Sequence, residues 1–389
     1  MSLTIDFAQV APDEIGKGVA ELCDELEAAH VAGWYGALTV ERPWSRHNPI
    51  LEGEFACPRA IRPYLERELG KLAAAGARVS AEKKREARDL HDPALLGALD
   101  ETSWNPTRKK LFLFGPERMA LSIDRLAHYT GTSAETFQRY VLFTNYSWHV
   151  DAFRERFPDA VGPVLGGRQM PAWHATRPGR DGISLVDIGV GPSNAKTITD
   201  HLAVLRPDLM LMIGHCGGLR NHQDIGDLVL ATTYHRADGV LDHVLPTSVP
   251  VASNYRLNSY LLDAVVRRDI PYRLGTVYTT ANRNWEFEQQ AVVGDMRLSR
   301  AVAVDMESAT VAANGFRYRV PTATLLAVSD KPLHGRPKLS DAAQEFYAAT
   351  KRWHLEVAIE VVDRVRETHP DGLPAADVRS PDEPLLGRD

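Results

Sequence analysis

The stretch ISLVDIGVGPSNAKTITDHLAVLRPDLMLMIGHCGGLR, residues 183–220, decides the fold of this chain. Its first apolar run ends in Gly189-Val190-Gly191-Pro192, which predicts a strand followed by a glycine turn. Apolar residues then recur at spacings of four and three up to position 205, which is typical of a helix. Ser193 or Asn194 is suited to be the N-cap of that helix, since both side chains accept hydrogen bonds from backbone N–H groups.

The second half of the same stretch predicts another strand. Leu209–Ile213 is a continuous apolar run, as expected of a parallel strand buried on both faces. We expect the following Gly214–Gly218 to form a second glycine turn. Either turn alone is explained by the need for a tight bend, but two of them at neighbouring strand ends of one βαβ unit favour a ligand site.

Composition narrows the class of protein. The chain has 389 residues, of which 44% are hydrophobic and 25% charged, and these values are ordinary for a soluble globular protein of two domains. A net charge of -6 argues against binding to nucleic acid. Cys23, Cys57 and Cys216 lack the spacing of metal ligands, and no run of residues fits a signal peptide or a membrane span. We therefore expect a cytoplasmic protein without a metal, a cofactor, or a nucleic-acid or membrane partner.

The order of periodic segments predicts two domains and a tail. Residues 1–136 are expected to form a smaller α+β domain with a regulatory or substrate-completing role, 137–368 the catalytic domain, and 369–389 a disordered tail. The elements expected in the first domain are helices at Glu14–His30, Arg59–Ala77 and Ala81–Asp89, a strand at Lys109–Phe114, and a strand passing into a helix over Met119–Tyr129.

Strands and helices alternate through the second domain, which predicts an α/β fold with a largely parallel core sheet. Further strands are expected at Gln138–Phe143, Gln169–His174, Asp227–Tyr234, Leu274–Thr280, Ala301–Val304 and Thr322–Val328. Further helices are expected at Trp148–Arg156, Asn258–Arg268, from Asp305 onward, and within Leu339–Thr368. Gln169–His174 and Ile183–Val190 are expected to pair like a hairpin.

Two carboxylates follow buried strands, at the edge where such folds place their sites. Glu307 opens a helix, where an acidic residue also suits the helix dipole. Asp330 follows another strand, where it could instead cap a helix or pair with Lys331. If they are functional, one carboxylate can accept hydrogen bonds from ribose hydroxyls, and a protonated one can donate to a leaving group. The residues alone leave both interpretations open.

Two other segments invite a chemical interpretation. His215 and Cys216 look like a nucleophile pair, but adjacent residues of a strand point in different directions, so Cys216 is better explained as core. Trp285 lies in a loop beside Arg283 and Asn284, an unusual setting for a core residue. This loop is suited to form a stacking wall for a planar base.

Several blocks of sequence resemble one family. These blocks are FTNYSWHVDAF (143–153), QMPAWH (169–174), the region from Asp187 to Arg220, TTANRNWE (279–286), LSRAVAVDMESATVAA (298–313) and LLAVSDKPLHG (325–335). Together they resemble the AMP nucleosidases, within the purine nucleoside phosphorylase superfamily. The resemblance covers about residues 118–350. It implies a three-layer α/β/α nucleoside phosphorylase-like domain, a homohexamer, and hydrolysis of AMP to adenine and ribose 5-phosphate.

The resemblance also implies roles for individual residues. Asp330 in VSDKP would be the acid at purine N7, and Glu307 in DMES would bind the ribose hydroxyls. The other substrate contacts it implies or suggests are Val190 and Gly191 along the sugar and base, Met306 under the sugar, Asn284 and Trp285 at the base, and Asn145 at a strand end. The family more usually has two acidic residues where this chain has Ala281-Asn282, which leaves the exact base open.

The resemblance bears on the nucleophile, whereas the site of the 5′-phosphate is expected where a cationic or N–H-rich pocket can form. Phosphorylases of the superfamily bind phosphate with arginines and a serine, whereas the equivalent places here hold Tyr146–His149, Met212 and His215. A dianion binds poorly without arginine, so water is the expected nucleophile. His215 would orient that water, touch the 5′-phosphate or hold its own turn. The candidates for the 5′-phosphate are Arg283 first, then Lys196, Arg118 or a neighbouring subunit.

Three other functions remain as alternatives. A phosphorylase would need phosphate, and a nucleosidase for unphosphorylated nucleosides such as methylthioadenosine would show in a substrate panel. A nucleotide sensor without turnover would bind and release no base. The presence of both Glu307 and Asp330 argues against the sensor.

Overall fold

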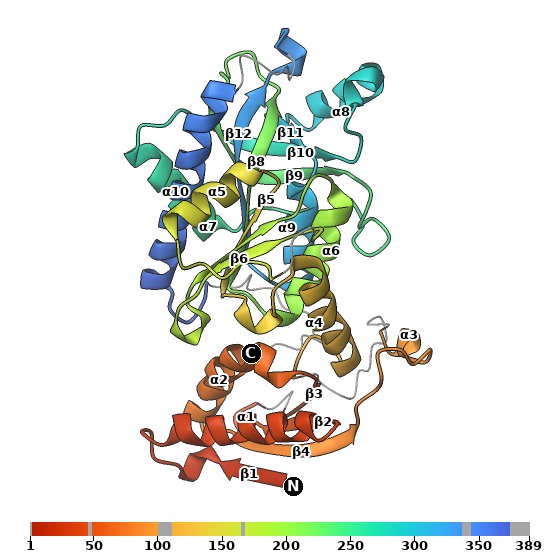
Figure 1. The fold of residues 1–389 in the computed structure, drawn as a ribbon, viewed down its shortest axis with the longest axis vertical. Coiled ribbons are helices and arrows are strands. Elements are labelled where there is room, and N and C mark those ends of the chain that lie inside the picture. Colours follow the sequence, from red (N-terminus) through yellow and green to blue (C-terminus); the bar gives the residue numbers. More distant parts are fainter. Residues whose placement is uncertain (1, 46–48, 100–110, 165–167, 337–343, 374–389) are drawn as a thin grey trace. The chain divides into compact units, whose positions relative to one another are not determined.

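The computed structural model describes residues 2–45, 49–99, 111–164, 168–336 and 344–373. It separates into two compact units, one formed mainly by residues up to Arg125 and the other by Leu126–Ala203 and Pro207–Ala375 (Figure 1). Most of the tail predicted to be disordered, 374–389, lies outside the described residues. Within the described ranges, no helix is both long and apolar enough to cross a bilayer.

The N-terminal unit is an antiparallel sheet with helices, as predicted. Its elements are β1 (Ser2–Asp6), α1 (Ile15–Val31), β2 (Trp34–Glu41), β3 (Ile50–Phe55), α2 (Pro58–Ala74), β4 (Arg78–Glu86), α3 (Leu95–Ala98) and the first part of α4 (Pro116–Thr130), whose residues from Leu126 onward belong to the second unit. The strands lie in the order β1-β4-β2-β3. The helices predicted at Glu14–His30 and Arg59–Ala77 are confirmed as α1 and α2.

Three predictions in this unit are wrong. The charged segment Ala81–Asp89 is not a helix, because residues up to Glu86 belong to β4, which pairs with both β1 and β2. The strand pairing, which buries Val79 and Ala81, outweighs the helix propensity of the Glu and Lys residues in this segment. Residues 111–114, the described part of a predicted strand, form bends, and the segment Met119–Tyr129 is helical throughout as part of α4.

The second unit contains a mixed eight-stranded sheet. Its strands are β5 (Tyr140–Thr144), β6 (Ala172–Ala175), β7 (Ile183–Asp187), β8 (Leu209–Gly218), β9 (Leu228–Ala237), β10 (Tyr272–Thr280), β11 (Ala303–Asp305) and β12 (Thr322–Asp330). Its α-helices are α5 (Ser147–Arg156), α6 (Pro192–Leu202), α7 (Tyr255–Arg267), α8 (Gln289–Leu298), α9 (Ser308–Tyr318) and α10 (Gln344–Thr368). Every strand and helix predicted for the described residues of 138–368 is present, with shifted ends.

The sheet order β11-β10-β9-β12-β8-β5-β7-β6 confirms the predicted α/β class. The pairs β7–β5, β5–β8, β8–β12, β9–β10 and β10–β11 are parallel, whereas β12 pairs with β9 in antiparallel fashion. β6 also pairs with β7 in antiparallel fashion, as the predicted hairpin-like pair requires. β11 pairs with both β10 and β8, so five strands close into a ring. Helices α5, α7 and α10 cover one side of the sheet and α6 and α9 the other, which gives three layers (Figure 1).

The predicted second glycine turn is wrong, because β8 continues through Gly214–Gly218. In this segment Gly217 pairs with Val304 of β11, and a Cβ atom on Gly217 would lie 3.0 Å from the Val304 side chain. A Cβ atom on Gly218 would lie 2.9 Å from the side chain of Val328. The glycines therefore allow other strands to approach β8 closely, rather than bending the chain.

The first glycine turn is confirmed, although its cap differs from the prediction. Gly191, at φ 113°, is the N-cap of α6, and Pro192 occupies the first helical position. A proline there loses no hydrogen bond, because the first N–H groups of a helix have no intrahelical partner. Asn194 instead donates its side-chain amide to the Ile188 carbonyl at 2.9 Å and so braces the turn.

The packing of α9 against β12 predicts a clear stability effect. A Cβ atom on Gly315 would lie 2.2 Å from the Thr322 methyl group and 2.9 Å from the Val320 carbonyl oxygen, so Gly315→Ala is expected to destabilise the protein by about 1–3 kcal/mol. Gly294 of α8 has nothing within 4 Å, so Gly294→Ala is expected to stabilise it by about 0.5–1 kcal/mol. Thermal unfolding of both variants checks this, and a Gly315→Ala protein that melts at or above the wild-type temperature would contradict it.

Candidate active site

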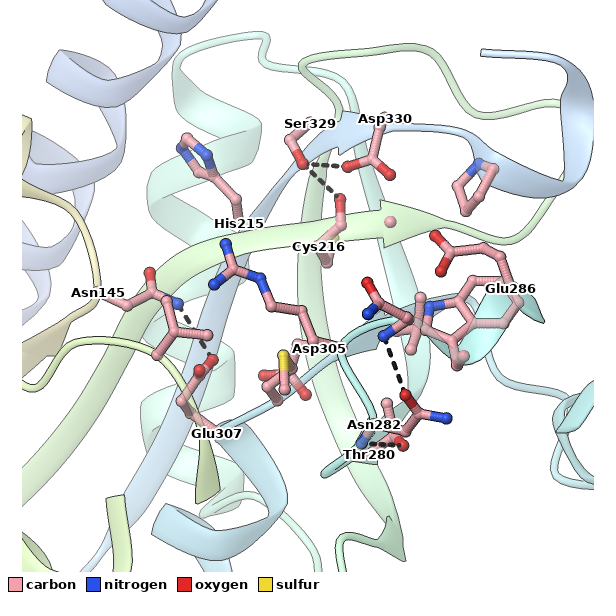
Figure 2. A pocket seen from close by; sticks show the side chains of 18 of the residues that line it. Asn145, His215, Cys216, Thr280, Asn282, Glu286, Asp305, Glu307, Ser329 and Asp330 are labelled. Carbon is pink, nitrogen blue, oxygen red and sulfur yellow. Dashed lines mark hydrogen bonds between the residues drawn. The ribbon is translucent and has the colours of Figure 1, made fainter. Parts of the chain in front are cut away.

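A cavity of about 360 Å³ lies where several strands of the second unit end (Figure 2). β8 contributes His215 to Gly217, β11 contributes Val304 and Asp305, and β12 contributes Ser329 and Asp330. Polar side chains at the ends of these strands meet because the chain returns to one edge of the sheet with each crossover. The crevice expected from residues 183–220 is therefore part of a larger site.

Most of the predicted site residues meet in this cavity. Those that line it are Asn145, Val190, His215, Arg283, Asn284, Trp285, Met306, Glu307 and Asp330. Gly191 is not among the lining residues, but its N–H group donates to Glu307 Oε1 at 2.6 Å. Lys196 is not among them either, and its amine bonds to Asp200 one turn along α6 at 2.6 Å.

Glu307 is buried at the start of α9, with 1% of its surface exposed. The Gly191 N–H group donates to one of its oxygens, and the Asn145 amide donates to the other at 3.1 Å. Burial, together with the nearby Asp305 carboxyl, raises the pKa of Glu307 to about 8 despite these donors. The site thus keeps a carboxyl that gains or loses its proton near neutral pH.

Asp305 is a second buried carboxyl of the cavity, which sequence analysis did not single out. The Thr279 hydroxyl donates to one of its oxygens at 2.6 Å, and the Ser308 N–H group donates to the other at 2.9 Å. Burial raises the pKa of Asp305 as well. Its position two residues before Glu307 on the same strand end was the available signal.

Asp330 ends β12 and faces the cavity beside Ser329 (Figure 2). The Ser329 hydroxyl donates to Asp330 Oδ1. The next residue, Lys331, is 6% exposed and donates its amine to the Asn221 carbonyl at 2.9 Å. Lys331 and Arg336 then exchange backbone hydrogen bonds, which closes the short loop after Asp330.

The loop after β10 forms another wall of the cavity. Trp285 is 5% exposed and packs with Leu219 and Tyr278, so it belongs both to a small core cluster and to the lining. Asn282 accepts a hydrogen bond from the Asn284 N–H group at 3.0 Å, which shapes the loop. Arg283 is exposed and is the one arginine or lysine among the described residues that line the cavity.

The rings of three histidines lie close together, and His215 is the one of them that lines the cavity. The His215 ring lies 4.1 Å from the ring of Tyr146 and 6.3 Å from those of His149 and His354, measured between centroids. His149 is hydrogen-bonded to the Thr144 hydroxyl at 2.7 Å. Burial lowers the pKa of His354 to about 4, so this ring is neutral at physiological pH. Of these rings, that of His215 is the one available for a hydrogen bond in the cavity.

Strands of the closed ring end at one cavity, which is lined by the carboxyl groups of Asp305, Glu307 and Asp330. The family model described as the phosphorylase superfamily matches residues 149–365. The crystal structure of purine nucleoside phosphorylase from Toxoplasma gondii has a TM-score of 0.53 at 16% identity and covers 62% of this chain and 98% of its own, which shows the shared fold.

More similar proteins specify the family within that class. AMP nucleosidase of Escherichia coli K12 is 46% identical, with a match that covers 73% of this chain and 67% of that protein. The crystal structure of AMP nucleosidase from Bacteroides thetaiotaomicron is 28% identical with a TM-score of 0.55, and it covers 65% of this chain and 99% of its own. The chain belongs to the AMP nucleosidase family of the phosphorylase superfamily.

Proposed function

We propose that this protein hydrolyses the N-glycosidic bond of AMP and releases adenine and ribose 5-phosphate. The observation that carries the proposal is that Glu307 and Asp330 line one cavity in a chain 46% identical to an AMP nucleosidase. One group is needed to improve the leaving base and another to hold the sugar, and this cavity supplies both.

Asp330 acts on the base. The glycosidic bond breaks toward an oxocarbenium ion, so the departing purine must gain a proton or a strong hydrogen bond. Asp330 gives its proton to N7, the electron pair of the C–N bond moves to the base, and neutral adenine leaves. General acid catalysis of this kind contributes about 10²–10⁴-fold in rate.

Glu307 acts on the sugar. As a carboxylate it accepts hydrogen bonds from the ribose hydroxyls, and its negative charge, on a side chain that is itself buried, stabilises the cationic sugar. The Gly191 and Asn145 donors hold the carboxyl group in place before substrate arrives. Val190 and Met306 form the apolar surface along the sugar, and Asn284 and Trp285 form the wall beside the base.

Water completes the reaction. Arg283 is the one arginine or lysine among the described residues that line the cavity, so a phosphate dianion at the anomeric carbon, in addition to the 5′-phosphate, lacks the charged partners that it needs. Water, oriented by His215, adds to the anomeric carbon and gives its proton to solvent water. Asp330 takes a proton back from solvent, which restores the acid for the next turnover. The 5′-phosphate binds Arg283.

The decisive experiment is chromatography of the products from AMP, adenosine, methylthioadenosine, GMP and CMP, with and without phosphate. Release of adenine and ribose 5-phosphate from AMP in phosphate-free buffer supports the proposal. Ribose 1,5-bisphosphate formed only with phosphate would make the protein a phosphorylase. Adenine released from adenosine or methylthioadenosine in preference to AMP would make it a nucleoside hydrolase, and binding without base release would make it a sensor.

Binding of the 5′-phosphate by Arg283 predicts that this residue sets the preference for AMP over adenosine. Arg283→Gln is expected to raise the KM for AMP by about 10- to 100-fold, because a charge-assisted hydrogen bond to phosphate is lost. Turnover of adenosine, which has no phosphate, is expected to stay the same. The matched control is Arg297→Gln on the exposed side of α8, outside the cavity lining. Equal losses for AMP and adenosine would move the phosphate site elsewhere, with Lys196 the next residue to test.

The biological setting belongs to the same proposal. We place the reaction in purine salvage in the cytoplasm and expect a homo-oligomer, with a hexamer favoured. Residues 1–136 then serve as a domain that regulates the enzyme or completes its site. Light scattering of the purified protein measures the oligomer, and a variant lacking these residues tests the role of the domain.

A further inference from the structure

Two hydrogen-bond acceptors among the described residues lie within reach of the Ser329 hydroxyl, which has one proton. Its Oγ donates to Asp330 Oδ1 and also lies 3.2 Å from the carbonyl oxygen of Cys216, in donor geometry for both (Figure 2). A serine hydroxyl donates one hydrogen bond at a time, so it can serve the carboxyl or the carbonyl. Whether the hydroxyl donates to Asp330 or to the Cys216 carbonyl depends on the charge of the Asp330 carboxyl group.

A β-bulge places this hydroxyl. Val328 pairs with Cys216 and Asp330 pairs with Gly217, so Ser329 is the extra residue between two consecutive pairs. Neighbouring side chains of a regular strand point to opposite faces, but a bulge re-aims them. Ser329 and Asp330 consequently both line the cavity, and Ser329 is only 4% exposed. The fold therefore holds the hydroxyl beside the carboxyl before any substrate binds.

We propose that Ser329 is a positioning residue whose hydroxyl turns from the Cys216 carbonyl to the Asp330 carboxylate as Asp330 gives its proton to the departing base. This inference rests on the proposed function, in which Asp330 is the acid. The hydrogen bond from Ser329 to Asp330 is then strongest in the transition state, when Asp330 becomes a charged carboxylate.

The proton count is balanced. The O–H bond of Asp330 at Oδ2 breaks, an N–H bond forms on the purine, and the negative charge stays on the carboxylate. Ser329 keeps its own proton and donates it to Oδ1, which has become a charged acceptor. Hydrogen bonds to charged acceptors are stronger than those to neutral ones, so the contact stabilises the transition state more than the ground state. The Cys216 carbonyl holds the hydroxyl in the resting state.

Ser329→Ala tests the inference through kcat and its pH dependence. We expect kcat to fall by about 10- to 100-fold with little change in KM, because a charge-assisted hydrogen bond is lost in the transition state. The high-pH limb of the kcat profile, where Asp330 loses its proton, is expected to move to higher pH, since a carboxylate without its donor has a higher pKa. Ser329→Thr keeps a hydroxyl and is expected to restore both properties.

The matched control is Ser253→Ala. Ser253 also donates its hydroxyl to a strand carbonyl, that of Ala231 at 2.7 Å, but it does not line the cavity. Its removal is expected to leave the pH profile unchanged. An unchanged kcat in Ser329→Ala, or a lower kcat with an unmoved high-pH limb and no rescue by threonine, would overturn the inference and leave Asp330 as the acid.

A second measurement does not depend on turnover. Carbon-13 NMR of aspartate-labelled protein, with Asp330→Asn to assign the signal, reports the pKa of the Asp330 carboxyl directly. Ser329→Ala is expected to raise it in the free protein, and an unchanged pKa contradicts the inference. If the wild-type protein releases no adenine from AMP, the proposed function fails, and this titration still decides whether Ser329 stabilises the carboxylate.

Discussion

Asp330→Asn is expected to lower kcat for AMP hydrolysis by about 10²–10⁴-fold while leaving AMP binding nearly intact. Asparagine has almost the same shape and can still accept the hydrogen bond from Ser329, but it has no proton of suitable acidity for the base. The loss therefore falls on the chemical step. Steady-state kinetics give kcat, and isothermal titration with AMP gives the affinity.

The control for Asp330→Asn is Asp263→Asn. Asp263 pairs with Arg364 outside the cavity, and its side chain is 49% exposed. We expect wild-type kinetics from this variant. Turnover of Asp330→Asn within a few-fold of the wild type would show that another group protonates the base, and a matching loss of AMP affinity would make Asp330 a binding residue instead.

Strong local patterns predicted most of the second unit. The apolar runs before Gly189 and Gly214 form β7 and β8, because a strand buried on both faces leaves a continuous hydrophobic signature. The sequence was misleading where pairing partners decide the structure. β4 carries helix-forming charges, yet it is held between β1 and β2. The hydrophobic periodicity of one segment contains no information about which strands will pair with it.

The same distinction applies to the site. Glu307 and Asp330 became candidates because carboxylates after buried strands stand out in a pattern of apolar runs, and the family resemblance implied their roles. Ser329 was missed because its role depends on a bulge, which only the register against β8 reveals. Asp305 was missed because a carboxylate at a strand end is also an ordinary helix cap, and its bond to the Ser308 N–H group fits that role.

Glu307→Gln is expected to lower kcat/KM for AMP by about 10²–10³-fold, through loss of the negative charge beside the cationic sugar. In the wild type, kcat/KM is expected to fall as pH decreases below about 8. Glu307 of the free enzyme becomes protonated in this range, and only its carboxylate form can accept hydrogen bonds from both ribose hydroxyls. Glutamine does not titrate, so this limb is expected to disappear. Its persistence in the variant would assign it to another group.

The same substitution has an opposite effect on stability, and the sign follows from the raised pKa. Between pH 4.5 and about 8 the folded protein keeps the Glu307 proton that the unfolded chain has lost. The contribution to stability is thus full at low pH and lost as pH rises to about 8, where a buried charge remains. Glu307→Gln carries no charge, and rotation of the Asn145 amide lets its side-chain carbonyl oxygen accept from the glutamine amide. We expect its Tm to exceed that of the wild type at pH 8–9 by on the order of 5 °C.

Glu360→Gln provides a control with the reverse trend. Arg267 and Arg268 donate to Glu360, and these bonds outweigh burial and lower its pKa. The stabilising charge is present at neutral pH and lost in acid, so Glu360→Gln should melt below the wild type at pH 8 and approach it toward pH 4. Melting curves of both variants from pH 4 to 9 should therefore diverge from the wild type in opposite directions as pH rises. If the Tm of Glu307→Gln instead falls below that of the wild type as pH rises, then the Glu307 carboxylate of the wild-type protein is stabilised without substrate. Burial would then not raise the pKa of Glu307, and the proposed link between its charge and binding of the cationic sugar would be contradicted.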